Sequence, residues 1–411
     1  MTGEWKECEL RDVAEVQTGP FGSQLKNEQY IAGGTPVVTV EHISNFRIID
    51  FDYPSVTEED KDRLSKYLLK TGDIIFTRVG SVDLSAYVKP HQDGWMFSSR
   101  MLRVRPKKDV DSRFLSYFFQ QNRFREYILN ISVGATMPSI NTEILKGITI
   151  SYPPLPEQRA IASVLSSLDD KIDLLHRQNK TLEAMAETLF RQWFVEEADE
   201  EWELTTLEKH TEVFRGLSYK GSGLTEKGFG IPMHNLNSVY EGGGYKTDGI
   251  KFYSLDYKER HLVFPGDIIV ANTEQGHEFK LIGFPAIVPD SFGNVGIFSQ
   301  HIYKVLPKNE TYLSREFIYY LLMSNSMREQ ILSATNGSTV NMLAIDGLQI
   351  PNFKLPPKIN VIEFTEHVSA YWSKISKNKN HIRTLEKMRD VLLPKLMSGE
   401  VRVELAQGKS A

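Results

Sequence analysis

The chain has 411 residues, and at about 150 residues per domain this length predicts two or three domains. Hydrophobic residues make up 41% and charged residues 25%, a composition that is typical of a globular protein and excludes a disordered or collagen-like chain. The 48 Lys and Arg against 53 Asp and Glu give a net charge of −5, so the total charge does not by itself indicate a nucleic-acid-binding protein.

The apolar segments and the cysteine content of the sequence indicate a cellular location. No apolar run reaches the roughly 18 residues that a membrane-spanning helix needs, and the first ten residues, MTGEWKECEL, lack the apolar stretch of a secretion signal. Cys8 is the only cysteine, so the chain forms no internal disulfide and no cysteine-rich zinc site. We therefore expect a cytoplasmic protein.

Residues 1–155 are predicted to form a mixed α+β domain with a twisted sheet. Short runs of β-branched and aromatic residues predict strands at 36–40, 73–77 and 102–105, and glycine-containing turns bound them. Apolar residues near helical spacing predict one helix over 112–130.

Within this domain, residues 61–125 carry 14 Lys and Arg against 6 acidic residues. Basic side chains interleaved with aromatic residues and glycines are typical of a surface that contacts phosphates and reads bases. We predict that four arginines contact phosphate or guanine: Arg78, Arg100, Arg103 and Arg105. Three polar residues are candidates for contacts with base edges: Ser98, Ser99 and Asn141. The alternative is that these residues form an ordinary solvated strand face and ordinary loops.

A long helix is predicted over 156–195, directly after Pro153-Pro154-Leu155-Pro156. Proline near the first turn, followed by Glu157, is typical of a helix start. Residues at steps of three and four then form a coiled-coil repeat of about four heptads, and we call its core positions the seam. The seam residues of this helix are Leu165, Leu168, Ile172, Leu175, Asn179, Leu182 and Leu189.

An acidic linker over 196–204 leads into a second copy of the same arrangement. Residues 205–357 are predicted to form a second α+β domain, 358–400 a second heptad helix and 401–411 a tail. The seam residues of the second helix are Ile375, Asn378, Ile382, Leu385 and Leu392.

Two heptad helices in one chain can pair with each other, so we predict an antiparallel intramolecular coiled coil between the two globular domains. Asn179 and Asn378 interrupt the two seams at core positions. A polar residue at such a position either fixes the register of the pair at a cost in stability or is merely tolerated.

The two halves of the chain repeat each other, which predicts a pseudo-twofold duplication. Three sets of matched residues carry the repeat: Gly72-Asp73-Ile74-Ile75 with Gly266-Asp267-Ile268-Ile269 at an offset of 194, Phe97-Ser98 with Phe298-Ser299 at 201, and Gly134 and Thr136 with Gly337 and Thr339 at 203. The offset drifts early in the repeat and is then constant, so insertions are expected in the first part of each half.

The second α+β domain has no comparable basic stretch, because residues 205–355 hold 14 Lys and Arg against 15 acidic residues. Its loops are instead rich in amides, which can form paired hydrogen bonds with an adenine edge. We predict contacts with base edges for four of them: Asn272, Gln275, Gln300 and Asn341. Amide-rich loops without a binding role are the alternative.

The sequence contains no HExxH pair, no GxSxG turn and no GxxxxGKS/T loop. Ser151-Tyr152-Pro153-Pro154 faintly resembles the loop that holds a flipped adenine in amino-methyltransferases, but its flanking residues are misplaced, so we interpret it as a turn that ends a strand. Asp267 followed by Glu278-Phe279-Lys280 has the spacing of a metal-dependent nuclease core. No acid-x-lysine sequence follows its repeat partner, Asp73. We therefore interpret both aspartates as parts of turns that directly precede buried strands.

Together these features resemble the specificity subunits of type I restriction–modification systems. The resemblance rests on the duplication, on the Gly-Asp-Ile-Ile turns, on residues 134–138, and on the string Pro153-Pro154-Leu155-Pro156-Glu157-Gln158-Arg159-Ala160-Ile161-Ala162 before the first heptad helix. It covers essentially the whole chain. The second joint departs from the pattern, because Pro356-Pro357-Lys358-Ile359-Asn360 lacks the Glu-Gln pair, so the two helix starts need not grip a partner identically.

The resemblance implies two target recognition domains that each read one half of a split, asymmetric DNA sequence, and no catalysis by this chain. It implies that the paired helices set the spacing and dock two adenine-methyltransferase subunits, with Arg159 and Arg177 as outer-face candidates for that contact. The methyltransferases would bring S-adenosylmethionine, and restriction subunits would bring ATP and Mg²⁺. Double-stranded DNA and these subunits are the expected partners, and this chain is expected to bind no cofactor and no metal.

Two other classes of protein stay open at this point. A fused restriction–methylation enzyme would need a cofactor motif, which the sequence lacks. A coiled-coil scaffold that binds only protein would differ from a specificity subunit in one respect, since its complexes would show no sequence-specific DNA binding.

Overall fold

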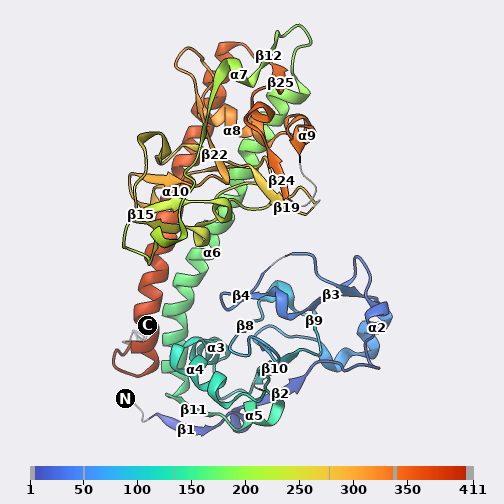
Figure 1. Cartoon of the computed structure of the whole chain (residues 1–411). Coiled ribbons are helices and arrows are strands. Elements are labelled where there is room, and N and C mark those ends of the chain that lie inside the picture. The colour runs from blue at the N-terminus through green and yellow to red at the C-terminus, as the bar shows by residue number, and fades with distance from the viewer. Residues whose placement is uncertain (1–4, 50, 135, 277, 337–339, 404–411) are drawn as a thin grey trace, which may run out of the picture. The chain divides into compact units, whose positions relative to one another are not determined.

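The computed structural model describes residues 5–49, 51–134, 136–276, 278–336 and 340–403 (Figure 1). Ala135, Gly337 and Thr339 of the repeated loops, and residues 404–411 of the predicted tail, lie outside the described residues. The chain divides into two compact units. The first unit is Met1–Ile172 with Thr384–Ala411, and the second unit is Asp173–Arg383.

The first unit is built on a four-stranded antiparallel sheet in the order β2-β10-β7-β8 and a three-stranded sheet in the order β6-β3-β9. Its strands are β1 (Lys6–Glu9), β2 (Ala14–Thr18), β3 (Thr35–Val38), β4 (Ile43–Ser44), β5 (Arg47–Ile48), β6 (Ser55–Val56), β7 (Ile74–Thr77), β8 (Ser85–Tyr87), β9 (Met96–Phe97), β10 (Met101–Pro106) and β11 (Thr149–Tyr152). The predicted strands are confirmed as β3, β7 and β10. Every residue of β7 is buried, because Ile74 and Phe76 enter one apolar core while Ile75, on the opposite face, enters another.

The short helices of the first unit are α1 (Leu10–Val13), α2 (Glu58–Arg63), α3 (Ser112–Gln120), α4 (Asn122–Ile131) and α5 (Thr142–Lys146). The single helix predicted over 112–130 is therefore wrong, since Gln121 is extended (φ −61°, ψ 137°) and separates α3 from α4. The break brings the ring of Phe124 to 4.9 Å from that of Phe119. Aromatic packing in the core thus outweighs the helical periodicity of the segment.

The second unit repeats this plan with a four-stranded sheet in the order β13-β22-β18-β20 and adds a five-stranded sheet in the order β14-β16-β15-β21-β17. Its strands are β12 (Leu204–Thr206), β13 (Thr211–Arg215), β14 (Leu224–Thr225), β15 (Ile231–His234), β16 (Lys251–Tyr253), β17 (Leu262–Val263), β18 (Ile268–Ala271), β19 (Thr273–Gln275), β20 (Pro285–Ile287), β21 (Gly296–Phe298), β22 (Ile302–Pro307), β23 (Thr335–Asn336), β24 (Val340–Leu343) and β25 (Asn352–Lys354). Its short helices are α7 (Leu207–His210), α8 (Arg315–Met323) and α9 (Asn325–Ser333). The matching sheet orders confirm the duplication.

Two long helices, α6 (Leu155–Arg191) and α10 (Lys358–Met397), are each drawn as one continuous ribbon in Figure 1, α6 in green and α10 in red. In the second unit Asn378 Nδ2 donates to Asn179 Oδ1 at 2.9 Å, and the rings of Phe190 and Phe364 lie 5.7 Å apart. Residue numbers therefore rise along α6 while they fall along α10. The predicted antiparallel pairing of the helices is confirmed.

The predicted seam is buried or half-buried throughout. The buried seam residues are Leu165, Ile172, Leu175, Asn179, Ile375, Asn378, Ile382 and Leu385. The half-buried ones are Leu168, Leu182, Leu189 and Leu392. Ile161 of α6 and Leu396 of α10 lie in the core of the first unit together with Phe114. The two long helices thus contribute to the domain cores.

His234, at the end of β15, is a buried titratable group in the second unit. It is 2% exposed, and its Nδ1 lies 2.6 Å from the hydroxyl oxygen of Tyr245. Burial disfavours the imidazolium form and lowers the pKa of His234 from its ordinary 6.5 to about 4. Burial also raises the pKa of the Tyr245 hydroxyl.

Replacing Asn378 by Leu should destabilise the protein by about 1–3 kcal/mol, because it leaves the buried amide of Asn179 without its partner. Replacing both asparagines by Leu removes both polar groups and should recover much of that loss. Thermal unfolding of the two single variants and the double variant measures the coupling, with Lys379→Ala at an exposed position as the control. Strictly additive losses would show that the two amides do not stabilise each other.

Lowering the pH from 7 to 4 should cost the second unit about 3 kcal/mol through His234. The unfolded chain binds the proton near pH 6.5 and the folded chain only near pH 4, so stability falls as the pH drops through this interval. Urea unfolding of the wild type and of His234→Gln at several pH values tests this. The variant should lose less stability over the same interval, and equal slopes would contradict the assignment.

Candidate nucleic-acid interface

A buried aspartate directly precedes β7 in the first unit and β18 in the second, and we call these two strands the central strands. In the first unit Asp73 is 1% exposed, and its Oδ2 accepts a hydrogen bond from the backbone nitrogen of Lys70 at 2.8 Å. Gly72 has a φ of +92°, a left-handed conformation that favours glycine. In the second unit Asp267 accepts from the backbone nitrogen of Phe264 at 2.9 Å. The interpretation of Gly-Asp-Ile-Ile as a turn before a buried strand is confirmed in both units.

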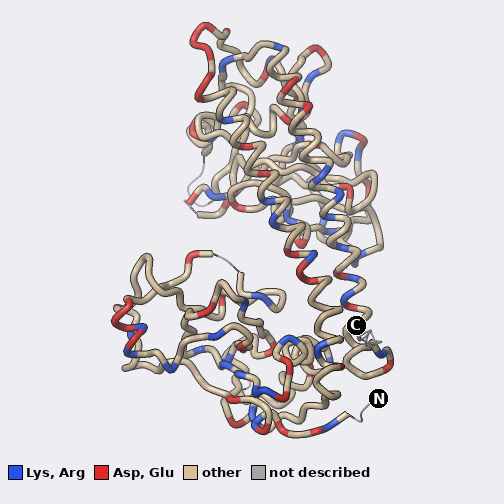
Figure 2. Tube along the Cα trace, turned by 180° about the vertical axis from the view of Figure 1, so that it is seen from behind, with Lys and Arg blue, Asp and Glu red and all other residues tan. Residues whose placement is uncertain are grey.

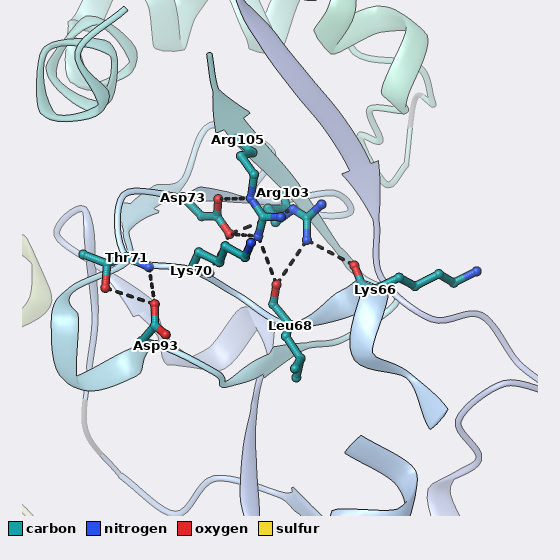
Figure 3. A network of polar contacts seen from close by, with 8 residues as sticks. All are labelled: Lys66, Leu68, Lys70, Thr71, Asp73, Asp93, Arg103 and Arg105. Atoms are coloured by element: carbon teal, nitrogen blue, oxygen red, sulfur yellow. Dashed lines mark hydrogen bonds and ion pairs between the residues drawn. The ribbon is translucent and has the colours of Figure 1, made fainter. Parts of the chain in front are cut away.

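Two arginines of β10 surround Asp73 (Figure 3). Arg105 donates through Nε to Oδ1 and through Nη2 to Oδ2, both at 2.7 Å. Arg103 is 4% exposed, and its Nη1 donates to the carbonyl oxygens of Lys66 and Leu68, both at 3.2 Å. The bonds with Asp73 raise the pKa of Arg105, whereas burial lowers the pKa of Arg103. The cluster is an internal network that ties β10 to the turn before β7.

The predicted DNA contacts of Arg103 and Arg105 stay predictions. In this structure the donors of both side chains point at a buried carboxylate and at backbone carbonyls. Alternate residues of a strand share one face, which places both side chains over the turn at 66–73. The sequence alone does not reveal that Asp73 lies beneath that face.

The second unit satisfies its aspartate with a different cation. Lys304 donates through Nζ to the carbonyl oxygen of Leu262 at 2.7 Å, as its counterpart arginine does in the first unit. Arg315 of α8 lies 3.4 Å from Asp267 Oδ1. Ser112 stands at the matching position of the first unit, at the repeat offset of 203. The duplication has kept the buried carboxylate and changed the position of its cation.

Four further basic residues of this stretch form ion pairs within the first unit. Arg125 Nη2 lies 2.5 Å from Asp83 Oδ2, and Lys61 Nζ lies 2.9 Å from Glu58 Oε2. Further pairs join Arg63 to Asp60 and Arg113 to Asp170. Figure 2 shows basic and acidic residues intermixed along this part of the trace. The positive charge counted in the sequence is therefore balanced in part by neighbouring carboxylates.

Three candidates of the first unit lie where β7 ends: Arg78 and Ser99, which are half-buried, and Arg100. The guanidinium of Arg78 lies 4.8 Å over the ring of Phe21, and its Nη1 donates to the carbonyl oxygen of Ser99 at 3.4 Å. Arg100 is exposed, and its side chain has no hydrogen bond or ion pair within the described part of the chain. Phe21, 46% exposed, was missed by the sequence reasoning, although its place in the Gly-Pro-Phe-Gly stretch at 19–22 marks an unusual exposed loop.

The second unit places a different set of side chains at the same location. The backbone nitrogen of Asn272 donates to the carbonyl oxygen of His301 at 3.2 Å, and Asn272 Nδ2 donates to that of Gln300 at 3.0 Å. Gln300 is exposed, and its Nε2 lies 3.3 Å from His301 Nε2. Gln275 is exposed at the end of β19. His301 was also missed, although it aligns with Arg100 at the repeat offset of 201.

Asn272, Asn341 and Asn141 form internal hydrogen bonds, and Ser98 is buried. Ser98, Asn272 and Asn341 are 8%, 4% and 3% exposed, and their predicted contacts with base edges stay predictions. Asn272 donates to a backbone carbonyl, and Asn341 donates to the carbonyl oxygen of Gly276. Asn141 is exposed, but its side chain accepts from the backbone nitrogen of Ile144 at 2.8 Å and caps α5. The contacts predicted for Asn141, Arg78, Ser99, Arg100, Gln275 and Gln300 stay predictions as well.

The proline-rich joints are held by different residues in the two units. Gln158 is completely buried, donates through Nε2 to the carbonyl oxygen of Pro153 at 2.8 Å and accepts from the backbone nitrogen of Asp111 at 2.8 Å. In the second unit the hydroxyl of Tyr312 donates to the carbonyl oxygen of Pro356 at 2.7 Å. Gln158 thus has a structural role at the first joint. At the second joint, which lacks this glutamine, Tyr312 binds the proline carbonyl instead.

The motifs weighed for catalysis also have structural explanations. β11 ends at Tyr152, which confirms the interpretation of the following prolines as a turn that ends a strand. Glu278 and Lys280 are exposed and pair with each other at 2.6 Å. No group of three or more His, Cys, Asp or Glu that could hold a metal ion occurs among the described residues. Within the same residues, no helix is long and apolar enough to cross a membrane.

Comparison with known proteins gives consistent matches over the chain. The family model described as type I restriction modification DNA specificity domain matches residues 2–184 and again 199–384. The chain is 27% identical to the type I restriction enzyme MjaIX specificity subunit of Methanocaldococcus jannaschii, over 98% of this chain and 94% of that protein. It is 23% identical to the HindI specificity subunit of Haemophilus influenzae, over 97% of this chain and 100% of that protein.

Among solved structures, the chain is similar to the crystal structure of a type I restriction–modification system S subunit from M. genitalium. The TM-score is 0.58 at 16% identity, over 98% of this chain and 97% of that one. This likeness concerns the fold, and it agrees with the α+β architecture with two sheet-rich units and two long helices.

Replacing Asp73 by Asn should destabilise the first unit by about 3–5 kcal/mol, because Arg103 and Arg105 lose the charge that balances them in a buried position. Denaturant unfolding of the full chain measures this, with Asp62→Asn at an exposed position as the matched control. A loss no larger than that of the control would contradict the structural role of the network.

A second substitution at the same network should restore stability that a first one removes. Arg105→Leu should be destabilising, and adding Ser112→Arg should restore part of the loss by copying the arrangement of Asp267 and Arg315. Absence of any recovery would show that the two units do not use equivalent sites for the cation.

Proposed function

The chain belongs to the type I restriction modification DNA specificity domain family, and we propose that each of its two units reads one half of a split, asymmetric DNA site. The observation that carries the proposal is the duplication of one sheet order, β2-β10-β7-β8 and β13-β22-β18-β20, with different exposed side chains at the same location. Two copies of one reading domain suit two half-sites, and unlike side chains suit an asymmetric sequence.

The long helices are proposed to set the spacing of the half-sites and to dock two adenine-methyltransferase subunits. Arg159 and Arg177 are exposed on α6 and are candidates for this contact. Large apolar side chains that stay exposed on the two helices support a docking role: Leu174, Met185, Met388 and Val391. The restriction and translocase subunits are proposed to join indirectly, through the methyltransferases.

This chain is proposed to supply sequence choice and no chemistry. S-adenosylmethionine, ATP and Mg²⁺ are assigned to the partner subunits, and the complex is proposed to act on DNA in the cytoplasm. Adenine methylation requires the base to leave the helix, a step that belongs to the methyltransferase.

Co-expression of this chain with the methyltransferase encoded beside it, followed by long-read sequencing of adenine methylation, tests the proposal. We expect a motif of two short half-sites at a constant spacing, which disappears when the gene for this chain is deleted. A control strain with the methyltransferase alone should show no such motif. Unchanged methylation and no complex with the methyltransferase would favour a scaffold that binds only protein.

A further inference from the structure

The two units have the same backbone junction at the end of the central strand. In the first unit the backbone nitrogen of Arg78 donates to the carbonyl oxygen of Arg100 at 2.8 Å. In the second unit the backbone nitrogen of Asn272 donates to the carbonyl oxygen of His301 at 3.2 Å. The same two residues also accept. The backbone nitrogen of Ile140 donates to the carbonyl oxygen of Arg78, and the backbone nitrogen of Leu343 donates to the carbonyl oxygen of Asn272, both at 2.9 Å. The chain therefore follows one path here in both units.

The turn that faces this junction is anchored identically in both units. The backbone nitrogen of Ser98 donates to the carbonyl oxygen of Val38, and the backbone nitrogen of Ser299 donates to the carbonyl oxygen of His234, both at 2.9 Å. A Cβ added to Gly19 would lie 2.1 Å from the Ser98 carbonyl oxygen, and one added to Gly216 would lie 2.1 Å from that of Ser299. Only glycine permits this approach, so both units need the same close packing beneath the turn.

Beyond this anchor the two turns differ completely in chemistry. Ser99 and Arg100 follow the buried serine in the first unit, whereas Gln300 and His301 follow it in the second. Arg100 and Gln300 are exposed at the two turns. By the repeat offset Gln300 matches Ser99, and Arg100 matches His301, so the exposed residue is the third of one turn and the second of the other. A rigid backbone that presents different polar side chains at one turn is the arrangement that sequence discrimination requires.

The exposed side chains match different bases. A guanidinium donates two parallel hydrogen bonds to the O6 and N7 atoms of guanine, and a glutamine amide pairs with the N6 and N7 atoms of adenine. Arg78 lies beside the first turn, held over the ring of Phe21 at 4.8 Å and bonded to the carbonyl oxygen of Ser99, and it adds positive charge at the same place. In the second unit the matching position holds the neutral side chain of Asn272.

We propose that the turn at 98–100 in the first unit and the turn at 299–301 in the second are the specificity-determining elements of this chain, with Arg100 reading a guanine and Gln300 reading an adenine in the major groove. This inference rests on the proposed function, because it assigns residues within the two half-site readers. It predicts a guanine contact in the half-site of the first unit and an adenine contact in that of the second.

Exchange of the turns tests the proposal in the full chain co-expressed with its methyltransferase. Ser99→Gln with Arg100→His gives the first turn the residues of the second, and Gln300→Ser with His301→Arg does the reverse. In each case the methylated motif should lose discrimination at one base pair of one half-site by about tenfold or more, while the other half-site and the spacing stay unchanged. The single substitution Arg100→Gln, at an exposed side chain without a partner in the described chain, provides a variant that keeps the turn intact.

Lys70→Ala is the matched control, because Lys70 is exposed in the same unit but lies outside the turn. It should leave every position of the motif unchanged. If the wild type produces a two-part motif and neither exchange nor Arg100→Gln alters any base preference, the assignment of the turns is overturned and the proposed function stands. If the wild type produces no two-part motif, the proposed function itself fails.

Discussion

Each of the two units completes its apolar core with segments from both long helices. In the first unit Leu165 of α6 lies in the same core as Leu396 of α10. In the second unit Phe190 of α6 and Phe364 of α10 both pack on Phe317 of α8, with ring centroids 5.4 and 6.4 Å away. Because each helix has apolar residues for a different domain at each of its ends, the first unit must combine chain segments that are far apart in sequence.

The duplicated domains need the same buried groups satisfied and use different residues to do so. In the first unit Asp169 accepts hydrogen bonds from the hydroxyl of Tyr117 at 2.6 Å and from Arg389 Nη1 at 3.0 Å. At the matching place of the second unit, Trp372 Nε1 donates to the hydroxyl oxygen of Tyr320 at 3.4 Å. The contact between domain and helix is thus ionic in one unit and aromatic in the other. The exchange of cations around Asp73 and Asp267 follows the same rule, since an unpaired polar group in a core costs free energy whichever residue pairs with it.

This internal use of polar residues changes how charge relates to recognition. A count of basic residues over 61–125 indicates a surface for phosphates. In the structure, however, Arg103 donates to backbone carbonyl oxygens, Arg105 pairs with Asp73, and Arg125 pairs with Asp83. Only a few side chains stay exposed around the ends of the central strands. Recognition in the proposed function therefore depends on where a rigid backbone presents these few groups, more than on the total charge of the domain.

The sequence by itself determined the duplication, the strands around each Gly-Asp turn and the antiparallel helices with their seam. These features are encoded locally, in residue spacing along an element or in repeated strings, so the chain displays them without any knowledge of contacts. Only the tertiary structure decided which arginines are free, that Gln121 interrupts a predicted helix, and that Asn272 is buried while Gln300 is exposed. The physical reason is that the exposure and the pairing of a side chain depend on partners distant in sequence. Arg105 of β10 binds Asp73, which precedes the neighbouring strand β7, and the spacing of residues along the chain does not predict this contact.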